Sequence, residues 1–238
     1  MRLFAYITVL CCLSAYCATA CAEPPPAGWS GNTQVGGVQT TGNTQSSTAD
    51  GKFKLNFLRH PWQNTVRLSG LYASTNGTTN AQNWQGSNQT RYSITKHNYL
   101  FGLFNAQAVR FSGYDYQVSE VFGLGRRLYD SPRQTLDIEA GMGARQSRLS
   151  EGGARSVGIS RLGMSYDFDI TEHSEFTQHV SMETGVNNTF IKSVSALKMS
   201  IYGPLSANLS YTITHNSNVP TGTRKTDTIS SVTLEYVF

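Results

Sequence analysis

The stretch DTISSVTLEYVF, residues 227–238, ends the chain and decides its fold. Counting back in twos from the last residue separates an apolar face from a mostly polar one: Phe238, Tyr236, Leu234 and Val232 against Val237, Glu235, Thr233 and Ser231. A period of two is that of a β-strand with one apolar side. Such a strand at a free sheet edge promotes aggregation in water. It fits a barrel closed in lipid, with Tyr236 and Phe238 in the interfacial aromatic girdle.

The end of this strand also resembles the C-terminal signal of bacterial outer-membrane proteins. The resemblance rests on a terminal Phe238 preceded by alternating Tyr236, Leu234 and Val232. It implies that Tyr236 and Phe238 form an assembly signal, which the outer-membrane assembly machinery reads.

The first 22 residues have the features of a secretory signal peptide. Met1-Arg2 is a short basic start, and an almost unbroken apolar run extends from Leu3 to Leu13. Small-x-small cleavage sites end at Ala20 and Ala22, of which we favour Ala22. Lipidation at Cys21 is the alternative. The chain is therefore divided into a signal peptide (1–22), a short leader (23–30) and an outer-membrane barrel (31–238), although the first strand pattern already begins near Trp29.

Cysteine usage and charge exclude several classes of protein. All four cysteines lie in the signal region, at positions 11, 12, 17 and 21. The exported chain therefore has no disulfide scaffold, thiol nucleophile or cysteine metal site. The formal net charge of +4 is mild and the basic residues are scattered, so we expect no nucleic-acid partner. We expect no cofactor and no metal.

From Trp29 onward, short alternating segments are separated by turn signals, which is the pattern of a transmembrane barrel. No apolar run after Leu13 approaches the length of a membrane-spanning helix. The expected fold is all-β: a single antiparallel up-and-down barrel of about twelve strands. The expected strands span 29–41, 46–58, 63–74, 88–96, 99–112, 115–128, 134–147, 155–168, 174–185, 189–202, 205–215 and 227–238.

An even strand number puts both ends of the barrel chain on one side, which is periplasmic in bacterial barrels. Tight turns are expected there, and longer loops over 75–87, 149–153 and 216–223 outside. Aromatic residues predict two girdles: Trp62, Tyr129, Phe168, Tyr202 and Phe238 on the periplasmic side, and Tyr72, Phe111, Tyr114 and Phe190 on the outer side.

An ordered series of short motifs also resembles one family. They are Gly42-Asn43-Thr44 with Ser46-Ser47, Tyr99-Leu100-Phe101-Gly102, Gly125-Arg126, the run from Glu139 to Arg145 (EAGMGAR), Phe176-Thr177-Gln178, residues 193–197, and Asn216-Ser217-Asn218-Val219-Pro220 with Thr226-Asp227. In this order they resemble the YdiY-like salt-induced outer membrane proteins (domain of unknown function 481). The resemblance covers essentially the whole exported chain. It implies an outer-membrane barrel with no established activity.

Charged residues on the polar strand faces are expected in the barrel lumen. They are Lys52, Lys54, Arg67, Asp137, Glu139, Arg145, Arg161, Asp167, Glu175, His179, Glu183 and Glu235. One hypothesis is a salt-bridge network that fills and stiffens the barrel, because charges in a low-dielectric space must be paired. The other is a narrow polar pore that selects small solutes. The pattern shows no excess of basic residues of the kind that an anion channel needs at a constriction.

His215 and Ser217 form the one motif that suggests catalysis. The segment His215-Asn216-Ser217-Asn218 resembles the His-x-Ser-Asn motif of outer-membrane phospholipase and lipid A deacylase, which implies a serine activated by a histidine. Asp227 is the only acid near the matching height of the neighbouring strand. Asn and Ser are also ordinary turn residues at a strand end. We therefore expect no enzyme, and a lipid-acting esterase is the alternative.

Two other groups of residues, a pair of glutamates and several strand glycines, give no indication of a catalytic site. Glu175 and Glu183 are about 27 Å apart along a strand, which is too far for paired acid–base work. Gly123, Gly125 and the pair at 141 and 143 lie on strands and are expected to let a strand bend or to leave room for a neighbouring side chain.

The sequence thus predicts an integral outer-membrane barrel of a Gram-negative bacterium with a structural or narrow-pore role, linked by the family name to salt. Its expected partners are outer-membrane lipid, lipopolysaccharide and the assembly machinery. A soluble β-sheet binder is a further alternative, which would carry its apolar residues inside.

Overall fold

The computed structural model describes residues 28–238 except for 41–45, 110–113, 150–151, 187 and 220–223. The expected signal peptide, both cleavage sites, Cys21 and Phe111 lie outside the described residues. None of the described residues forms a helix that is long and apolar enough to cross a membrane.

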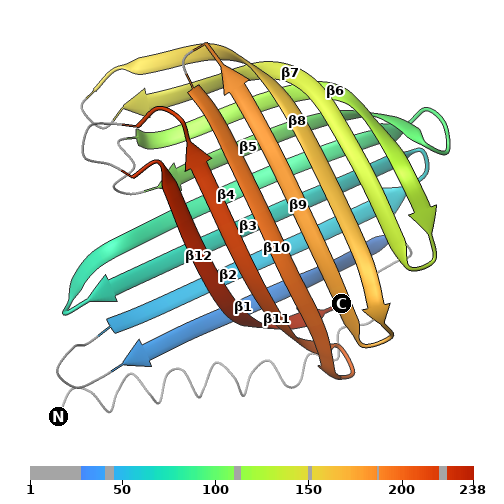
Figure 1. Cartoon of the computed structure of the whole chain (residues 1–238), viewed down its shortest axis with the longest axis horizontal. Coiled ribbons are helices and arrows are strands. Elements are labelled where there is room, and N and C mark those ends of the chain that lie inside the picture. The colour runs from blue at the N-terminus through green and yellow to red at the C-terminus, as the bar shows by residue number, and fades with distance from the viewer. Residues whose placement is uncertain (1–27, 41–45, 110–113, 150–151, 187, 220–223) are drawn as a thin grey trace.

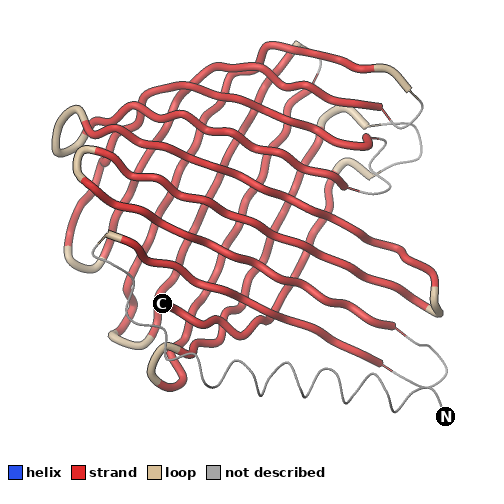
Figure 2. The backbone as a smooth tube through the Cα atoms, turned by 180° about the vertical axis from the view of Figure 1, so that it is seen from behind, coloured by secondary structure: helices blue, strands red, loops and turns tan. Residues whose placement is uncertain are grey.

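Twelve antiparallel strands close into one barrel, in which each strand pairs with its neighbours along the chain and β1 pairs with β12 (Figures 1 and 2). The strands are β1 (Trp29–Thr40), β2 (Ser46–Arg59), β3 (Trp62–Thr75), β4 (Thr78–Ser93), β5 (Asn98–Val109), β6 (Tyr114–Ser131), β7 (Gln134–Leu149), β8 (Ala154–Thr171), β9 (Ser174–Gly185), β10 (Asn188–Tyr202), β11 (Leu205–Asn216) and β12 (Thr226–Val237). The all-β, up-and-down barrel prediction is confirmed. We call the end where β1 begins and β12 ends the terminal end, and the opposite end the loop end.

The final strand closes the barrel. β12 pairs with β11 on one side and with β1 on the other, where Tyr236 lies opposite Thr33. Phe238 continues the seam, because its N–H donates to the carbonyl of Gly31 (2.9 Å) and its carbonyl accepts from the N–H of Gly31 (2.8 Å). The strand therefore leaves no free edge, and the hazard of an unpaired apolar strand is removed by closure.

The strand faces have apolar residues outside and polar residues inside. Phe122 and Met142 are more than two-thirds exposed on the outer wall, whereas Glu235 and Thr233 are buried on the inner side. The pattern is that of a wall in contact with lipid. It is the reverse of the phase required by a soluble barrel binder, so that alternative is not supported.

The largest error in the strand prediction is the segment before residue 88. It was expected to be the longest loop, but β4 begins at Thr78 and pairs with β3 after the two-residue turn Asn76-Gly77. Both turn residues have positive φ (50° and 77°), as a tight hairpin turn of this kind requires. Asn-Gly is the strongest short hairpin signal, and it outweighs the weak alternation that follows it.

Two smaller expectations also need correction. The leader was extended to residue 30, but Trp29 and Ser30 already belong to β1 and pair with β2. Phe190 was assigned to the outer aromatic girdle, but its ring lines the lumen and lies 5.6 Å from the guanidinium of Arg145. A guanidinium over an aromatic face is a favourable contact, so the ring serves the inner wall.

A small apolar core lies inside the barrel, on the inner faces of β5, β6 and β8. It consists of Tyr99, Phe101, Val121 and Ile159, with Leu103 and Val157 beside it. A methyl group added at Gly125 would lie 2.2 Å from the Tyr99 ring, and one at Gly123 would lie 2.8 Å from Phe101. Of the two roles expected for these glycines, the contacts at Gly125 support room for a neighbouring side chain, whereas Gly123 also lies close to the backbone of β7. The apolar side chains of this core fill part of the barrel interior and narrow the lumen beside β5, β6 and β8.

Candidate functional site

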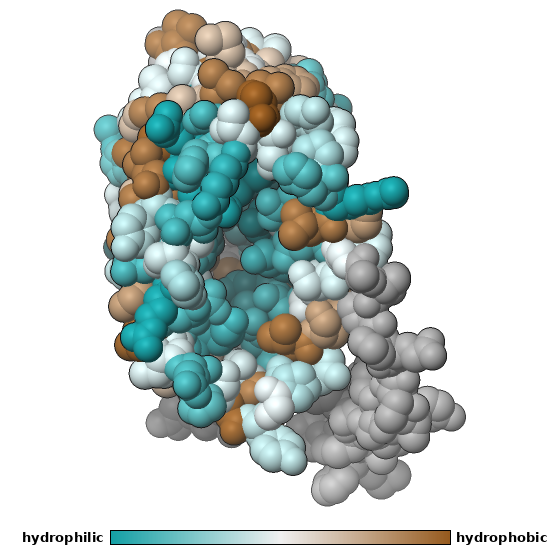
Figure 3. All heavy atoms as spheres, turned by 90° about the vertical axis from the view of Figure 1, so that its right-hand side faces the viewer, coloured by the Kyte–Doolittle hydropathy of each residue, from teal (hydrophilic) through white to brown (hydrophobic). Residues whose placement is uncertain are grey.

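The candidate site is the barrel lumen. It contains a cavity of about 480 Å³, and residues from all twelve strands line it. Seen from the terminal end, the middle of the barrel is a hollow lined by hydrophilic side chains (Figure 3). A polar, hollowed interior inside an apolar wall is the arrangement of channel-forming barrels.

The structure places the predicted charged residues in this lumen. Those that line the cavity are Lys52, Lys54, Arg67, Glu139, Arg145, Arg161, Asp167, Glu175, His179, Glu183 and Glu235. Asp137 is buried on the same face and binds two arginines. Tyr236 and Phe238 lie on the outer wall at the terminal end, where their role in assembly stays a prediction.

One charge network lies near the terminal end, between β4 and β7. Arg91 forms ion pairs with Asp137 (3.0 Å) and Glu139 (2.7 Å), and Arg127 pairs with Asp137 at 2.9 Å. The hydroxyl of Tyr99 donates to Glu139 at 3.1 Å, and its ring lies under the Arg91 guanidinium. Every charge in this cluster has an opposite charge, so the cluster braces the wall rather than offering a free site.

A second network lies nearer the loop end and has Glu183 at its centre. This buried carboxylate pairs with Arg161 at 2.8 Å and with Arg145. The three residues belong to β7, β8 and β9, so one acid joins three adjacent strands. Two guanidinium groups held by a single carboxylate leave a local excess of positive charge, which the neighbouring Phe190 ring partly stabilises.

The remaining acids of the cavity differ in how well they are paired. The Oε2 atom of Glu235 accepts hydrogen bonds from the amides of Gln34 (2.9 Å) and Asn208 (3.0 Å). Glu175 forms an ion pair with Lys198. Asp167 is the least satisfied acid, since its contact is a 3.4 Å hydrogen bond from Thr135.

The sequence prediction missed several lumen cations. Arg91, Lys192 and Lys198 also line the cavity, so the expected absence of a basic excess is wrong. Arg91 lies on a strand whose alternation is weak. Lys192 and Lys198 were left unassigned, although their separation of six residues on one strand puts them on the same face. That spacing was the available signal.

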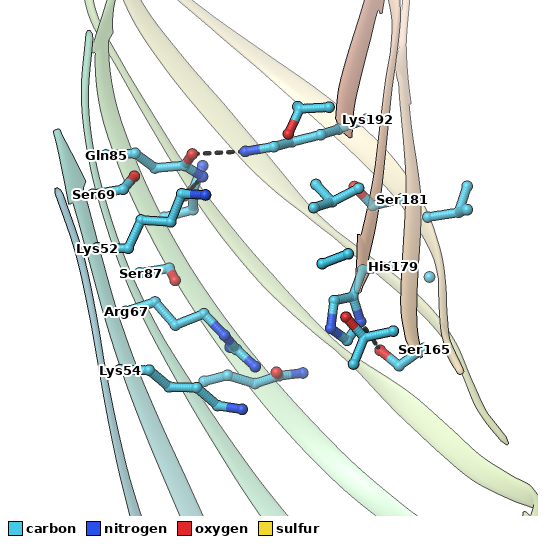
Figure 4. A pocket seen from close by; sticks show the side chains of 18 of the residues that line it. Lys52, Lys54, Arg67, Ser69, Gln85, Ser87, Ser165, His179, Ser181 and Lys192 are labelled. Carbon is cyan, nitrogen blue, oxygen red and sulfur yellow. Dashed lines mark hydrogen bonds between the residues drawn. The ribbon is translucent and has the colours of Figure 1, made fainter. Parts of the chain in front are cut away.

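Four cations of the cavity have no carboxylate within 4.0 Å among the described residues. They are Lys52, Lys54, Arg67 and Lys192 (Figure 4). Lys52 donates to Ser210 at 3.2 Å, and Lys192 donates to Gln85 at 2.8 Å. Both acceptors are neutral, so the positive charge of this set is uncompensated by ion pairing.

The residues of the suspected catalytic motif are held apart from one another. His215 Nδ1 shares a hydrogen bond with Thr226 (2.8 Å), whereas the Ser217 hydroxyl donates to Asn188 at 3.1 Å. Asp227 lies opposite Thr214, one residue from His215, so it faces the other side of the wall. These contacts fit strand-end hydrogen bonding. The absence of enzyme activity stays a prediction.

Comparisons with known proteins agree with this architecture. The family described as "Protein of unknown function, DUF481" matches residues 33–238. The chain is 25% identical over 207 residues to the uncharacterized protein YdiY of Escherichia coli (strain K12), which covers 87% of this chain and 82% of that protein.

Two solved outer-membrane structures share the fold. An outer membrane channel from Pseudomonas putida F1 superposes with a TM-score of 0.55 at 10% identity, covering 92% of this chain and 98% of that one. The NanC porin gives a TM-score of 0.51 at 9% identity, covering 87% and 97%. At such low identity the likeness shows the fold alone, which is that of outer-membrane β-barrels.

Proposed function

Because the chain belongs to the DUF481 family, described only as proteins of unknown function, we propose its function from the barrel itself. The protein is a narrow, water-filled channel across the outer membrane of a Gram-negative bacterium. The observation that carries this proposal is the polar cavity of about 480 Å³ along the lumen. Such a cavity gives small hydrated solutes a path through the apolar belt.

The arrangement of ion pairs favours a channel over a solid plug. The networks around Glu139 and Glu183 follow the wall of β4 to β9 and join strands that are one to three positions apart. They stiffen the barrel while the centre stays hollow (Figure 3). The lumen narrows where Lys192 of β10 reaches Gln85 of β4, six strands away around the ring. This crossing is the expected constriction.

The location rests on the same features. Export through a cleaved signal peptide, insertion beside lipid and lipopolysaccharide, and recognition of Tyr236 and Phe238 by the assembly machinery agree with the apolar outer wall. Membrane fractionation tests the location, and gel mobility with and without boiling tests the folded barrel. Recovery in the soluble fraction with no mobility shift would contradict the proposal.

Single-channel recording in planar bilayers tests conduction. We expect small unitary currents in 1 M KCl. Gln85→Ala should raise the unitary conductance, because it removes the acceptor that holds Lys192 across the lumen. Gln146→Ala is the matched control, since Gln146 is exposed and lies outside the set that lines the cavity. A folded protein without current in either form would refute the channel and leave a structural barrel.

The family resemblance adds a physiological role. We propose that the channel contributes to the response of the cell envelope to salt, as the name of the family that the sequence resembles implies. Growth of a deletion strain at raised NaCl concentration, with and without the intact gene supplied in trans, tests this role. Equal growth of both strains across the salt series would contradict it.

A further inference from the structure

The cavity is divided into a neutralised part and a positively charged part. The cations that pair with carboxylates are Arg91, Arg145, Arg161 and Lys198. Lys52, Lys54, Arg67 and Lys192 pair with none within 4.0 Å in the described part of the chain. These four cations are therefore available to an anion that enters the cavity.

The register puts three of these cations together on one wall. In the β2–β3 ladder Lys54 lies directly opposite Arg67, and Lys52 lies opposite Ser69 in the next inward row. Like charges directly opposite each other destabilise a sheet. Figure 4 shows Lys52, Arg67 and Lys54 one above another, all projecting into the cavity. No ion pair within 4.0 Å offsets this repulsion within the described residues.

The fourth cation faces them from the other side of the lumen. Lys192 of β10 projects toward β4, where its ammonium group donates to the Gln85 amide oxygen at 2.8 Å (Figure 4). An ammonium group has three donors, so this bond leaves capacity for an anionic acceptor. Gln85 lies opposite Ser69, in the same row as Lys52, so the two lysines flank one level of the cavity.

The rest of these two rows offers small neutral donors. On the facing wall, Ser181 lies beside Lys192, and His179 hydrogen-bonds Ser165 at 3.1 Å. On the near wall Ser69 lies beside Lys52, and Ser87 lies beside Arg67 (Figure 4). The nearest acids on these strands lie one inward row away: Asp50 is two residues before Lys52 on β2, Glu183 is two residues after Ser181 on β9, and Asp167 is two residues beyond Ser165 on β8. Hydroxyl groups and cations together form the donor set for an oxyanion.

We propose that Lys52, Lys54, Arg67 and Lys192 form a binding site for small polyvalent oxyanions, which makes the lumen selective for anions. The ligand carries two or more carboxylate or phosphate groups, so that it contacts both walls at once. A cavity of about 480 Å³ is within the range of ordinary small-molecule sites. This inference rests on the proposed channel for its selectivity, whereas binding alone does not require conduction.

Binding is tested on the folded barrel in detergent with citrate and inorganic pyrophosphate as probes, at constant ionic strength held with KCl. We expect both probes to raise the thermal unfolding midpoint, as a ligand specific to the folded state does. Lys192→Gln should weaken the apparent affinity roughly threefold to tenfold, and the triple change K52Q/K54Q/R67Q should abolish the shift. Lys96→Gln is the matched control in an exposed turn and should leave the shift unchanged.

Asp167→Asn gives a test in the opposite direction. It removes an acid of the cavity that forms no ion pair and leaves the four cations in place, so citrate should bind more tightly. A citrate response without a pyrophosphate response assigns the site to carboxylates, and the reverse assigns it to phosphates. Equal midpoints with and without both probes would overturn the site, as would an undiminished shift in the folded triple variant.

Selectivity is read from reversal potentials across a KCl gradient. The parent protein should pass chloride in preference to potassium, and K52Q/K54Q/R67Q should bring the two permeabilities close to equal. Conduction without chloride preference and without probe binding would sink this inference while the channel stands. Probe binding that depends on the four cations, in a barrel that carries no current, would sink the channel while the site stands.

Discussion

Replacement of Glu183 by glutamine tests how far the lumen charges hold the barrel together. Glu183 is the one carboxylate shared by Arg145 and Arg161, and the side chains are 7%, 10% and 16% exposed. Glutamine keeps the shape and one acceptor oxygen but removes the charge. Two guanidinium groups then share the inner wall without an anion.

The size of the effect follows from the geometry. A unit pair at the 2.8 Å of the Arg161–Glu183 contact attracts by about 6 kcal/mol at an effective dielectric of 20. Desolvation of both ions opposes most of this attraction. Removing one partner from a buried pair costs about 3–5 kcal/mol, against less than about 1 kcal/mol at exposed sites. We expect Glu183→Gln to lower the unfolding free energy by about 3 kcal/mol, the lower end, because the new amide still accepts a hydrogen bond.

The assay is reversible urea unfolding of the barrel in lipid vesicles, followed by tryptophan fluorescence and by gel mobility. Glu172→Gln, in an exposed turn, is the matched control and should change the free energy by less than about 0.5 kcal/mol. The double variant E183Q/R161Q should recover part of the loss, since one unpaired cation goes with the acid. A loss of less than about 0.5 kcal/mol for Glu183→Gln alone would refute the view that this acid braces three strands.

Three further predictions concern other parts of the molecule. Gly143→Ala should destabilise the barrel by about 2 kcal/mol or prevent folding, because the added carbon would lie 1.8 Å from the carbonyl oxygen of Glu120. The control Gly163→Ala should fold normally in the same urea assay, because its added carbon would lie 3.5 Å from the nearest atom. Equal stability of the two variants would contradict the argument. Ser217→Ala should leave hydrolysis of a short-chain acyl ester at the background rate of the parent, because Ser217 donates to Asn188 and His215 bonds Thr226; a parent rate above background that falls in the variant would establish the hydrolase instead. Phe238→Ala should reduce the assembled fraction in cells severalfold while refolding into detergent in vitro proceeds, and equal losses in both settings would show that Phe238 acts only through its packing.

The strand phase was predictable wherever the outer wall is apolar. β7 is the clearest case, with Ile138 and Met142 exposed outward and Asp137 and Arg145 buried inward. Lipid imposes this contrast, so a period of two survives in the sequence. Twelve strands and their closure could be anticipated from it.

The contrast between an apolar outer face and a polar inner face is weaker where polar side chains on the outer wall form hydrogen bonds with one another. On β3 and β4 the amide of Asn64 donates to Asn88 (3.1 Å) and Thr90 (2.8 Å), all on the outer face. On β9 and β10 the amide of Gln178 donates to Ser193 at 2.9 Å. Hydrogen bonding between neighbours removes the requirement for an apolar side chain at these positions. Alternation therefore weakens in β4 and β10, the strands that carry Arg91 and Lys192.

The pairing of the lumen charges could not be predicted even where their direction could. Arg91 finds Glu139 three strands away, and Lys192 finds Gln85 on the opposite side of the ring. Such partners depend on the strand tilt and the width of the barrel, which no local pattern records. The inward charges predicted from the sequence suggest a balanced lumen, because that set omits Arg91, Lys192 and Lys198.

The lumen charges are no longer balanced once all the cations that line the cavity and their contacts are considered. Glu139 and Glu183 form ion pairs with arginines on their own side of the barrel, and Glu235 accepts hydrogen bonds from side-chain amides. The wall formed by β2 and β3 keeps Lys54 opposite Arg67 with no acid in contact. The field that a solute meets is the sum of all the fixed charges. Among the described residues that line the cavity, eight Lys and Arg side chains outnumber five Asp and Glu side chains. The excess is positive, and the cations without a carboxylate partner lie on β2 and β3 and at the Lys192 crossing, so the lumen is expected to discriminate by sign.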